Sequence, residues 1–270
     1  MSFYGSSFSF DGVSCEEYNL MVYDFGSTGR GDSAFVTREP FEDRLPGGYT
    51  PLYYGSTLNR PLEFSLVFGV NTAAIDRHIP MDHWDMEGIA AWLTGPDGYR
   101  NLEIEQGDLD AVRYKCMVSE LRQVTVGWSP WAMACKVRCD SPYGYLCERV
   151  FTYNVQLGLT AELYNRGTHC GYYLPKLKIT GLGSGLGGRS VSIRNLSDGG
   201  RETALLNIPA GVGEITLDQR RGVITNSAGV NLYDHFNHRF CRLVRGKNTL
   251  QFSGVFTAGF HCEFPVNVGG

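Results

Sequence analysis

Histidine and cysteine side chains are the first candidates for chemistry in this chain, because they are common protein ligands of Zn²⁺. Three sets lie near enough in the sequence to converge on one ion: His78 with His83; Cys135 with Cys139 and Cys147; and His235 with His238 and Cys241. No set has the Cys-x-x-Cys spacing, or the His-Glu-x-x-His pattern on a helix, that identifies a zinc site. We therefore expect buried thiols, surface histidines and no bound metal.

A glycine-rich stretch, GSGLGG at residues 183–188, has the G-x-G-x-x-G spacing of a dinucleotide-binding turn. Such a turn needs a helix after it, because the helix N-terminus holds the pyrophosphate. Residues 189–195 alternate like a strand instead, which favours a hairpin or loop. Ser184 lacks the offsets of a G-x-S-x-G nucleophile elbow, and acidic residues such as Glu103 and Glu105 have no spacing that identifies a hydrolase. The sequence predicts neither a catalytic residue nor a cofactor.

The segment from His235 to Arg239, HFNHR, resembles the H-x-N-x-R core of the galectin sugar-binding motif. Galectins follow this core with a tryptophan on which the sugar stacks and with a glutamate, whereas no tryptophan follows Trp131 here. His235, Asn237 and Arg239 are thus candidate sugar contacts. The plainer interpretation is a turn that leads into a strand at residues 240–243.

The composition is that of a globular protein with a bias towards strands. Hydrophobic residues make up 43% and charged residues 19% of the chain, and the 34 Gly, 15 Tyr and 15 Phe favour strands and tight turns. The formal net charge of −4 leaves no basic footprint for nucleic acid. We expect a mainly β protein that binds no nucleic acid sequence-specifically.

Neither a secretory signal nor a membrane span can be recognised. The N-terminal residues lack the basic and apolar segments of a signal peptide, and no stretch approaches the roughly 20 apolar residues that span a bilayer. We expect synthesis in the cytoplasm, no membrane insertion, and reduced thiols at all eight cysteines.

Hydrophobic periodicity predicts the elements of the first half. Alternating apolar residues indicate strands at residues 8–10, 20–25, 62–70, 112–118 and 131–139. Met86, Ile89 and Leu93 lie at helical spacing, which predicts one helix that Asp82 caps and that ends by Thr94. After the last of these strands, Pro142 and Gly144 predict a turn. Residues 26–48 predict an extended loop or arm, longer than a compact domain needs.

The second half reads as short strands separated by turn residues. We expect strands at residues 176–180, 190–195, 202–206, 214–217, 222–225, 240–243, 248–253 and 260–266. Strands without a helix, at this spacing, favour a jelly-roll-like β-sandwich. The predicted domains are residues 1–150 and 151–270.

Several stretches taken together resemble the distal tail protein family of long-tailed (siphovirus) bacteriophages. In the first half they are FSFDGVSCEEYNLMV, NRPLEFSLVFG, IAAWLTG, RYKCMVSEL and VRCDSPYGY. In the second half, YNRGTHCGYYLPKLKITG is similar to the opening of that family's C-terminal domain, and LVRGKNTLQFSG to its closing strand. The likeness covers nearly the whole chain.

The resemblance implies a structural virion protein at the phage tail tip, made in the cytoplasm of the host bacterium, and no enzyme. Such proteins form a hexameric ring, with an N-terminal β-sandwich belt domain that carries one helix and a galectin-like C-terminal β-sandwich outside it. The ring joins the tail tube to the tail-tip hub of the baseplate and lets DNA pass. Implied partners are further copies of the chain, the tail tube protein, the hub protein, the tape measure protein and the receptor-binding protein.

A ring of identical copies needs a contact between neighbouring copies. The arm and the aromatic run from Tyr49 to Tyr54 are candidates for the contact between copies, with Tyr49, Tyr53 and Tyr54 as the interface residues, because tyrosine buries a large area and keeps a polar tip. The alternative for the tyrosines is that they cover their own domain.

The alternative function is a carbohydrate-binding virion protein that contacts the host surface through the C-terminal domain, and a tail-associated hydrolase is a third interpretation.

Overall fold

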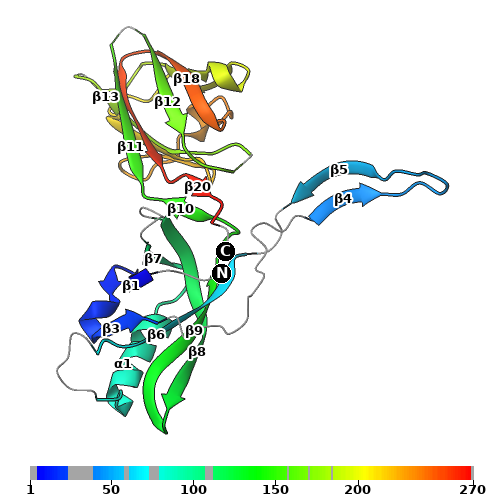
Figure 1. Cartoon of the computed structure of the whole chain (residues 1–270). Coiled ribbons are helices and arrows are strands. Elements are labelled where there is room, and N and C mark those ends of the chain that lie inside the picture. The colour runs from blue at the N-terminus through cyan, green and yellow to red at the C-terminus, as the bar shows by residue number, and fades with distance from the viewer. Residues whose placement is uncertain are drawn as a thin grey trace. The chain divides into compact units, whose positions relative to one another are not determined.

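The computed structural model describes residues 5–23, 39–57, 61–72, 79–106, 112–156, 158–169, 171–183 and 185–268. The chain forms two compact units: Met1–Tyr145 with Asn267–Gly270, and Leu146–Val266 (Figure 1). The polypeptide therefore crosses between the units twice, and the second unit is inserted into the first. The predicted mainly β class, with one α-helix in the first half and a β-sandwich in the second, is confirmed.

The first unit is built on one large antiparallel sheet. Its main path runs in the order β2 (Val13–Ser14), β1 (Gly5–Phe10), β7 (Arg100–Gln106), β8 (Val112–Val126), β9 (Ser129–Cys139), β6 (Glu63–Val70) and β3 (Leu20–Val22). Two short strands, β10 (Gly144–Leu146) and β20 (Pro265–Val266), lie off this path. The five strands predicted for this half are confirmed, although β8 is longer than predicted and β3 ends at Val22. Residues 24–25 of that prediction lie outside the described part of the chain.

The helix α1 (His83–Thr94) packs against this sheet, and the 3-10 helix η1 (Cys15–Tyr18) lies next to it, since Tyr18 stacks on Trp92 with ring centroids 4.8 Å apart. Asp82 caps α1, since its carboxylate accepts from the Asp85 N–H at 2.8 Å. Asp85 completes the capping box by accepting from the Asp82 N–H at 3.0 Å. Trp92 is buried, stacks on Phe8 with ring centroids 5.6 Å apart, and donates its indole N–H to the Phe10 carbonyl at 3.2 Å. The predicted helix and its cap are confirmed.

Part of the predicted arm is a β-hairpin, with a register shift between Phe41 and Glu42, and not an extended loop. Strands β4 (Glu39–Asp43) and β5 (Leu52–Thr57) pair antiparallel and form a two-stranded sheet of their own (Figure 1). The reversal lies in the run from Leu45 to Gly48, where the Gly48 N–H donates to the Leu45 carbonyl at 2.9 Å and Gly47 has φ +84°. Pro46 followed by Gly47 suits a type II turn, a signal that the sequence prediction overlooked. Residues 26–38 of the predicted arm lie outside the described residues.

The second unit is a sandwich of two antiparallel sheets. One has the order β11 (Arg149–Val155), β19 (Phe256–Cys262), β13 (Lys176–Gly181), β16 (Glu214–Asp218) and β17 (Val223–Asn226). The other has the order β12 (Leu159–Asn165), β18 (Gly246–Ser253), β14 (Val191–Asn195) and β15 (Arg201–Leu205). Inward residues of both sheets form one core, in which Leu177, Ile193, Phe252 and Phe260 are buried. Short 3-10 helices, η2 (Leu196–Asp198) and η3 (Tyr233–His235), lie in its connections.

Three predictions for this unit need correction. The strand expected at residues 240–243 is wrong: the segment is irregular, and its one recorded strand-like pairing is an isolated bridge between Leu243 and Tyr173. The last predicted strand begins earlier, at Phe256, and breaks after Cys262. Strands β11 and β12 were not predicted. Burial, not strand pairing, produces the alternation at 240–243, since Cys241 and Leu243 are buried in the core.

The two ends of the inserted unit lie side by side, because the Leu146 N–H donates to the Phe264 carbonyl at 2.9 Å. Within the first unit, Val268 is buried next to Gly144. A Cβ added at residue 144 would lie 2.5 Å from the Val112 side chain and 3.0 Å from that of Val268. Gly144 belongs to β10 and has no positive φ, so the turn conformation predicted for it is wrong. The position excludes a side chain because of close packing.

Candidate functional site

The β4–β5 hairpin, residues 39–57, is called the arm from here on, in place of the predicted residues 26–48. It exposes the aromatic residues that the sequence analysis named. Tyr49 is fully exposed, and Tyr53 and Tyr54 are exposed by 63% and 68%. Other large apolar side chains of the arm are also exposed: Phe41, Leu45 and Leu52. An isolated two-stranded hairpin is at best marginally stable in water, and contiguous exposed apolar surface marks an interaction site. The arm therefore has the features of a contact element.

Apolar side chains lie on both faces of the arm. Tyr53 pairs with Glu42, and the next residue, Leu52, pairs with Asp43. Because successive residues of a strand point to opposite faces, Tyr53 and Leu52 occupy different faces, each beside a carboxylate. A partner that covered only one face would leave the other in water. This geometry suits insertion between two surfaces.

The galectin-like segment is a turn whose polar groups are largely used inside the domain. The Asn237 amide donates to the Glu202 carbonyl at 2.9 Å, and its oxygen accepts from the Arg239 N–H at 3.2 Å. A ring nitrogen of His235 lies 3.2 Å from the Leu206 carbonyl. Of the three candidate sugar contacts, Arg239 alone is classed as exposed. Two of the three candidates, His235 and Asn237, thus have side-chain atoms within hydrogen-bond distance of backbone carbonyls of their own domain.

A buried asparagine network explains two motifs on which the family resemblance rested. Asn248 of β18 donates to the carbonyls of Val244 and Gly246 at 2.8 and 3.1 Å, and its oxygen accepts from the Val244 N–H at 2.8 Å. Asn195 of β14 donates to the Asn248 oxygen at 2.9 Å, and Asn165 of β12 donates to the Val244 carbonyl at 3.2 Å. These side chains hold the loop before β18 in place, so their role is structural.

The sequence analysis missed Trp128, at the end of the β8–β9 hairpin. Val126 pairs with Ser129, so Gly127 and Trp128 form a two-residue turn, with φ values of +59° and +73°. Positive φ at both positions is the type I′ pattern of tight hairpins. Trp128 is 99% exposed, and a non-glycine residue in the left-handed region costs roughly 1–2 kcal/mol. No sequence signal pointed to it, because tryptophan is not a usual turn residue.

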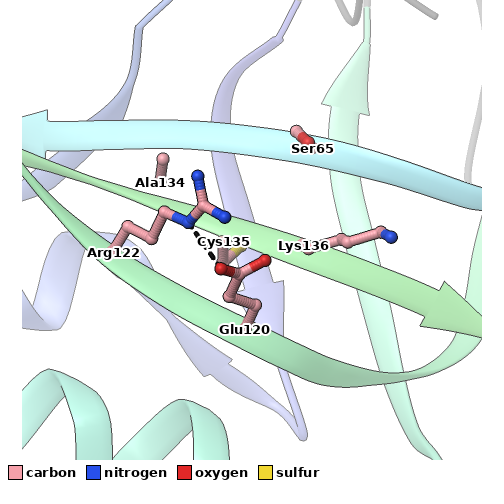
Figure 2. Close-up of a pocket in the computed structure, with 6 residues that line it drawn as sticks. All are labelled: Ser65, Glu120, Arg122, Ala134, Cys135 and Lys136. Atoms are coloured by element: carbon pink, nitrogen blue, oxygen red, sulfur yellow. Dashed lines mark hydrogen bonds and ion pairs between the residues drawn. The ribbon is translucent and has the colours of Figure 1, made fainter.

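A hollow of about 320 Å³ lies on the face of the first unit's sheet further along the same hairpin (Figure 2). Its lining residues come from strands β6, β8 and β9: Ser65, Glu120, Arg122, Ala134, Cys135 and Lys136. Figure 2 shows the Arg122 guanidinium above β9, where its Nε donates to the Glu120 carboxylate at 2.5 Å. Lys136 pairs with Glu63 at 3.3 Å. The hollow has a small-residue floor and a rim of paired charges.

The cysteines of the described residues are buried for the most part: Cys15, Cys116, Cys135, Cys139, Cys241 and Cys262 are free thiols in the two cores. Burial raises the pKa of Cys135 and that of Cys241 to about 12. Across the described part of the chain, no three His, Cys, Asp or Glu side chains group in a way that could hold a metal ion. Within the same residues, no helix is long and apolar enough to cross a membrane.

Comparison with family models decides the class of this protein. A model of a phage tail protein N-terminal domain matches residues 3–141, and a model of a phage tail C-terminal domain matches residues 143–262. The chain belongs to this phage tail protein family. The predicted resemblance to phage distal tail proteins agrees with these models, and the protein is a component of the phage tail.

Solved structures show the same fold at low sequence identity. The crystal structure of the Dit protein of phage SPP1, described as a paradigm of the hub adsorption apparatus in phages that infect Gram-positive bacteria, matches with a TM-score of 0.66 and 13% identity. That match covers 96% of this chain and 98% of the SPP1 chain. A chain of the phage p2 baseplate in its activated conformation with Sr matches with a TM-score of 0.53 and 10% identity, over 96% of this chain and 97% of that one. No curated protein matches this chain.

Proposed function

We propose that this phage tail protein is a distal tail protein whose copies close into a ring, most simply of six, at the tip of the virion's tail. The ring joins the tail tube protein to the tail-tip hub and leaves a channel for DNA. The observation that carries this proposal is the arm, with apolar side chains exposed on both faces. A contact between two different surfaces of identical subunits closes into a ring when the rotation allows it.

The two units have separate roles in this proposal. The first unit, close to the predicted domain of residues 1–150, forms the belt, and Tyr49, Tyr53 and Tyr54 of its arm contact the neighbouring copy. The second unit, close to residues 151–270, lies outside the belt. Further partners are the tape measure protein and the receptor-binding protein. The role is mechanical, with no enzymatic step.

The channel wall of the proposed ring is neutral or acidic. Cationic side chains facing the DNA would pair with phosphates, release counterions and hold the genome. The net charge of −4 agrees with this sign. The Arg113 cation of the first unit is also neutralised by the Glu103 carboxylate at 2.6 Å.

The test is the mass of the purified full chain in solution. Size-exclusion chromatography with light scattering, at high micromolar concentration, should give a species near six times 30.0 kDa, and micrographs should show closed rings. A second arm adds the tail tube protein of the same phage, which can supply a surface on which the ring closes. A monodisperse monomer in both arms would contradict the proposal.

Carbohydrate binding by the second unit is the other function that the sequence suggested. The hydrogen bonds of Asn237 and His235 to backbone atoms work against it. A glycan array with the full chain separates the two functions, and the ring proposal expects no specific glycan signal.

A further inference from the structure

We infer that Trp128 of one copy binds in the hollow on the first unit's sheet of a second copy. This inference rests on the proposed self-assembly and names the residues of one contact within it. The tryptophan and the hollow are different surfaces of the same unit, so their contact is head-to-tail. Contacts of that kind build rings or filaments.

Trp128 has the properties of an anchor residue. Its side chain is 99% exposed on a two-residue turn, and its φ of +73° is unfavourable for a bulky residue. Backbone strain of this kind persists where the surrounding structure enforces it, and it concentrates at functional sites. Here the register of a long antiparallel hairpin, from Val126 opposite Ser129 back to Cys116 opposite Cys139, fixes the turn. Tryptophan is also among the residues most enriched at binding hot spots.

The hollow suits an indole ring chemically. Its floor includes Ala134, whose short side chain leaves room, and its volume is about 320 Å³. Arg122 and Lys136 on its rim are cations that can lie against an aromatic face. Their carboxylate partners, Glu120 and Glu63, neutralise the rim, so an uncharged ring can enter without leaving a cation unpaired.

A copy cannot fill its own hollow with its own Trp128. Arg122 is paired with Ala134, and this pair lies four positions along β8 from Val126 and five along β9 from Ser129, the residues that flank the turn. At about 3.3 Å per residue, the turn lies roughly 13 Å along the strands from the hollow. The contact therefore requires a second copy.

The experiment uses two variants that each remove one half of the contact. Trp128→Ala removes the side chain that binds, and Ala134→Phe fills the hollow from its floor. Light scattering over a concentration series should show self-association of the full chain weakened by at least about 30-fold in either variant, the loss typical of a hot-spot residue. Arg122→Ala should weaken it by roughly 3-fold, as expected for an exposed cation–π contact.

Mixing the two variants gives the sharpest outcome. The Trp128→Ala copy keeps its hollow, and the Ala134→Phe copy keeps its tryptophan, so a pair of unlike copies can form one contact between Trp128 and a hollow and cannot pass that contact on to a third copy. We expect a two-copy species from the mixture and none from either variant alone. Far-UV circular dichroism and melting temperature confirm that each variant is folded.

Trp84 provides a matched control, because it is another exposed tryptophan, at 76%, on helix α1. Trp84→Ala should leave self-association unchanged. If the unaltered chain assembles and Trp128→Ala assembles equally well, this inference is wrong and the ring proposal stands. If Trp128→Ala keeps self-association but loses binding to the tail tube protein, the occupant is that protein and the inference is again wrong. A chain that never self-associates contradicts both.

Discussion

Three asparagine side chains in the second unit are buried and hydrogen-bonded to one another or to the loop at residues 244–246. In the first unit, by contrast, Tyr49, Tyr53 and Trp128 extend into solvent without covering a core. Even a tyrosine that is half exposed in the second unit, Tyr172, has an intramolecular partner, since the Arg242 guanidinium lies 3.8 Å from its ring centre. These buried asparagines and Tyr172 of the second unit have partners inside the chain, while the aromatic rings of the first unit named above are exposed to solvent.

This difference separates residues that stabilise the fold from residues that bind. A buried polar group left without a partner costs free energy in the isolated chain. An exposed aromatic ring costs little there and contributes only when another surface covers it. Stability measurements should therefore respond to the asparagine network, and assembly measurements to the aromatic side chains of the first unit.

The largest effect is expected for Asn248→Ala. The change leaves the buried Val244 N–H without its acceptor and removes one of the two acceptors of the Asn195 amide, which keeps the Arg242 carbonyl. We therefore expect the free energy of unfolding of the second unit to fall by about 3 kcal/mol. Urea unfolding of the full chain measures it. Asn154→Ala, at an exposed position whose oxygen accepts from the Thr257 hydroxyl, should change stability by less than about 0.5 kcal/mol. Equal losses of unfolding free energy in the two variants would contradict the stabilising role assigned to the buried asparagines.

The arm should behave in the opposite way. Replacing Tyr53 and Tyr54 together by serine removes apolar surface that is largely exposed in the isolated chain. The free energy of unfolding should therefore change by less than about 0.5 kcal/mol. Self-association, followed by light scattering, should weaken at least about 10-fold. Tyr164→Ser is the control, because Tyr164 is 60% exposed on β12 of the second unit. A larger effect of the control on association would reverse the roles assigned to the two units.

A buried cysteine should make stability depend on pH in the same way in both units, and unfolding at alkaline pH tests this. Burial, with a smaller contribution from Asp140, raises the pKa of the Cys139 thiol from 9.0 to about 12, and burial raises that of Cys241 in the second unit likewise. The unfolded thiol loses its proton near pH 9, whereas the folded one keeps it until about pH 12. The stability from each neutral thiol is therefore complete below pH 9 and is lost as the pH rises from 9 to 12.

Cys139→Ala and Cys241→Ala isolate this contribution. Each variant should lose about 1 kcal/mol less stability than the unaltered chain between pH 8 and pH 10. Any cavity left by the substitution is the same at both pH values, so the difference between them reports the thiol alone. Thermal unfolding at the two pH values measures it, and a difference in one unit only would show that the interiors are not alike.

The fold could be predicted wherever a side-chain period is set by burial on one face. This holds for α1, with its capping Asp82, and for five strands of the first sheet, but β7 was missed although Leu102 and Ile104 alternate there with exposed or half-buried residues. The same signal was misleading at residues 240–243, because Cys241 and Leu243 belong to an irregular segment and are nevertheless buried in the core. It was too weak at β11, where no more than the last residue, Val155, is fully buried.

The candidate surfaces were predictable only in part. The aromatic run from Tyr49 to Tyr54 is visible as composition, and its exposure followed once the hairpin was known. The positive φ of Trp128 is set by the pairing of Val126 with Ser129, which local spacing does not reveal. The segment from His235 to Arg239 matched a motif by spacing, but its hydrogen-bond partners, Leu206 and Glu202, come from elsewhere in the chain.

Because Leu146 and Phe264 lie side by side, the second unit is an inserted domain that could be removed or replaced. An inserted domain whose two ends lie close together can be removed or replaced without distorting the domain that carries it. Val268, which follows the second unit in the chain, is buried in the first unit. We expect a chain in which a short Gly-Ser linker joins Tyr145 to Asn267 to keep the first unit folded. Loss of the helical circular dichroism signal of α1 in that chain would contradict this modularity.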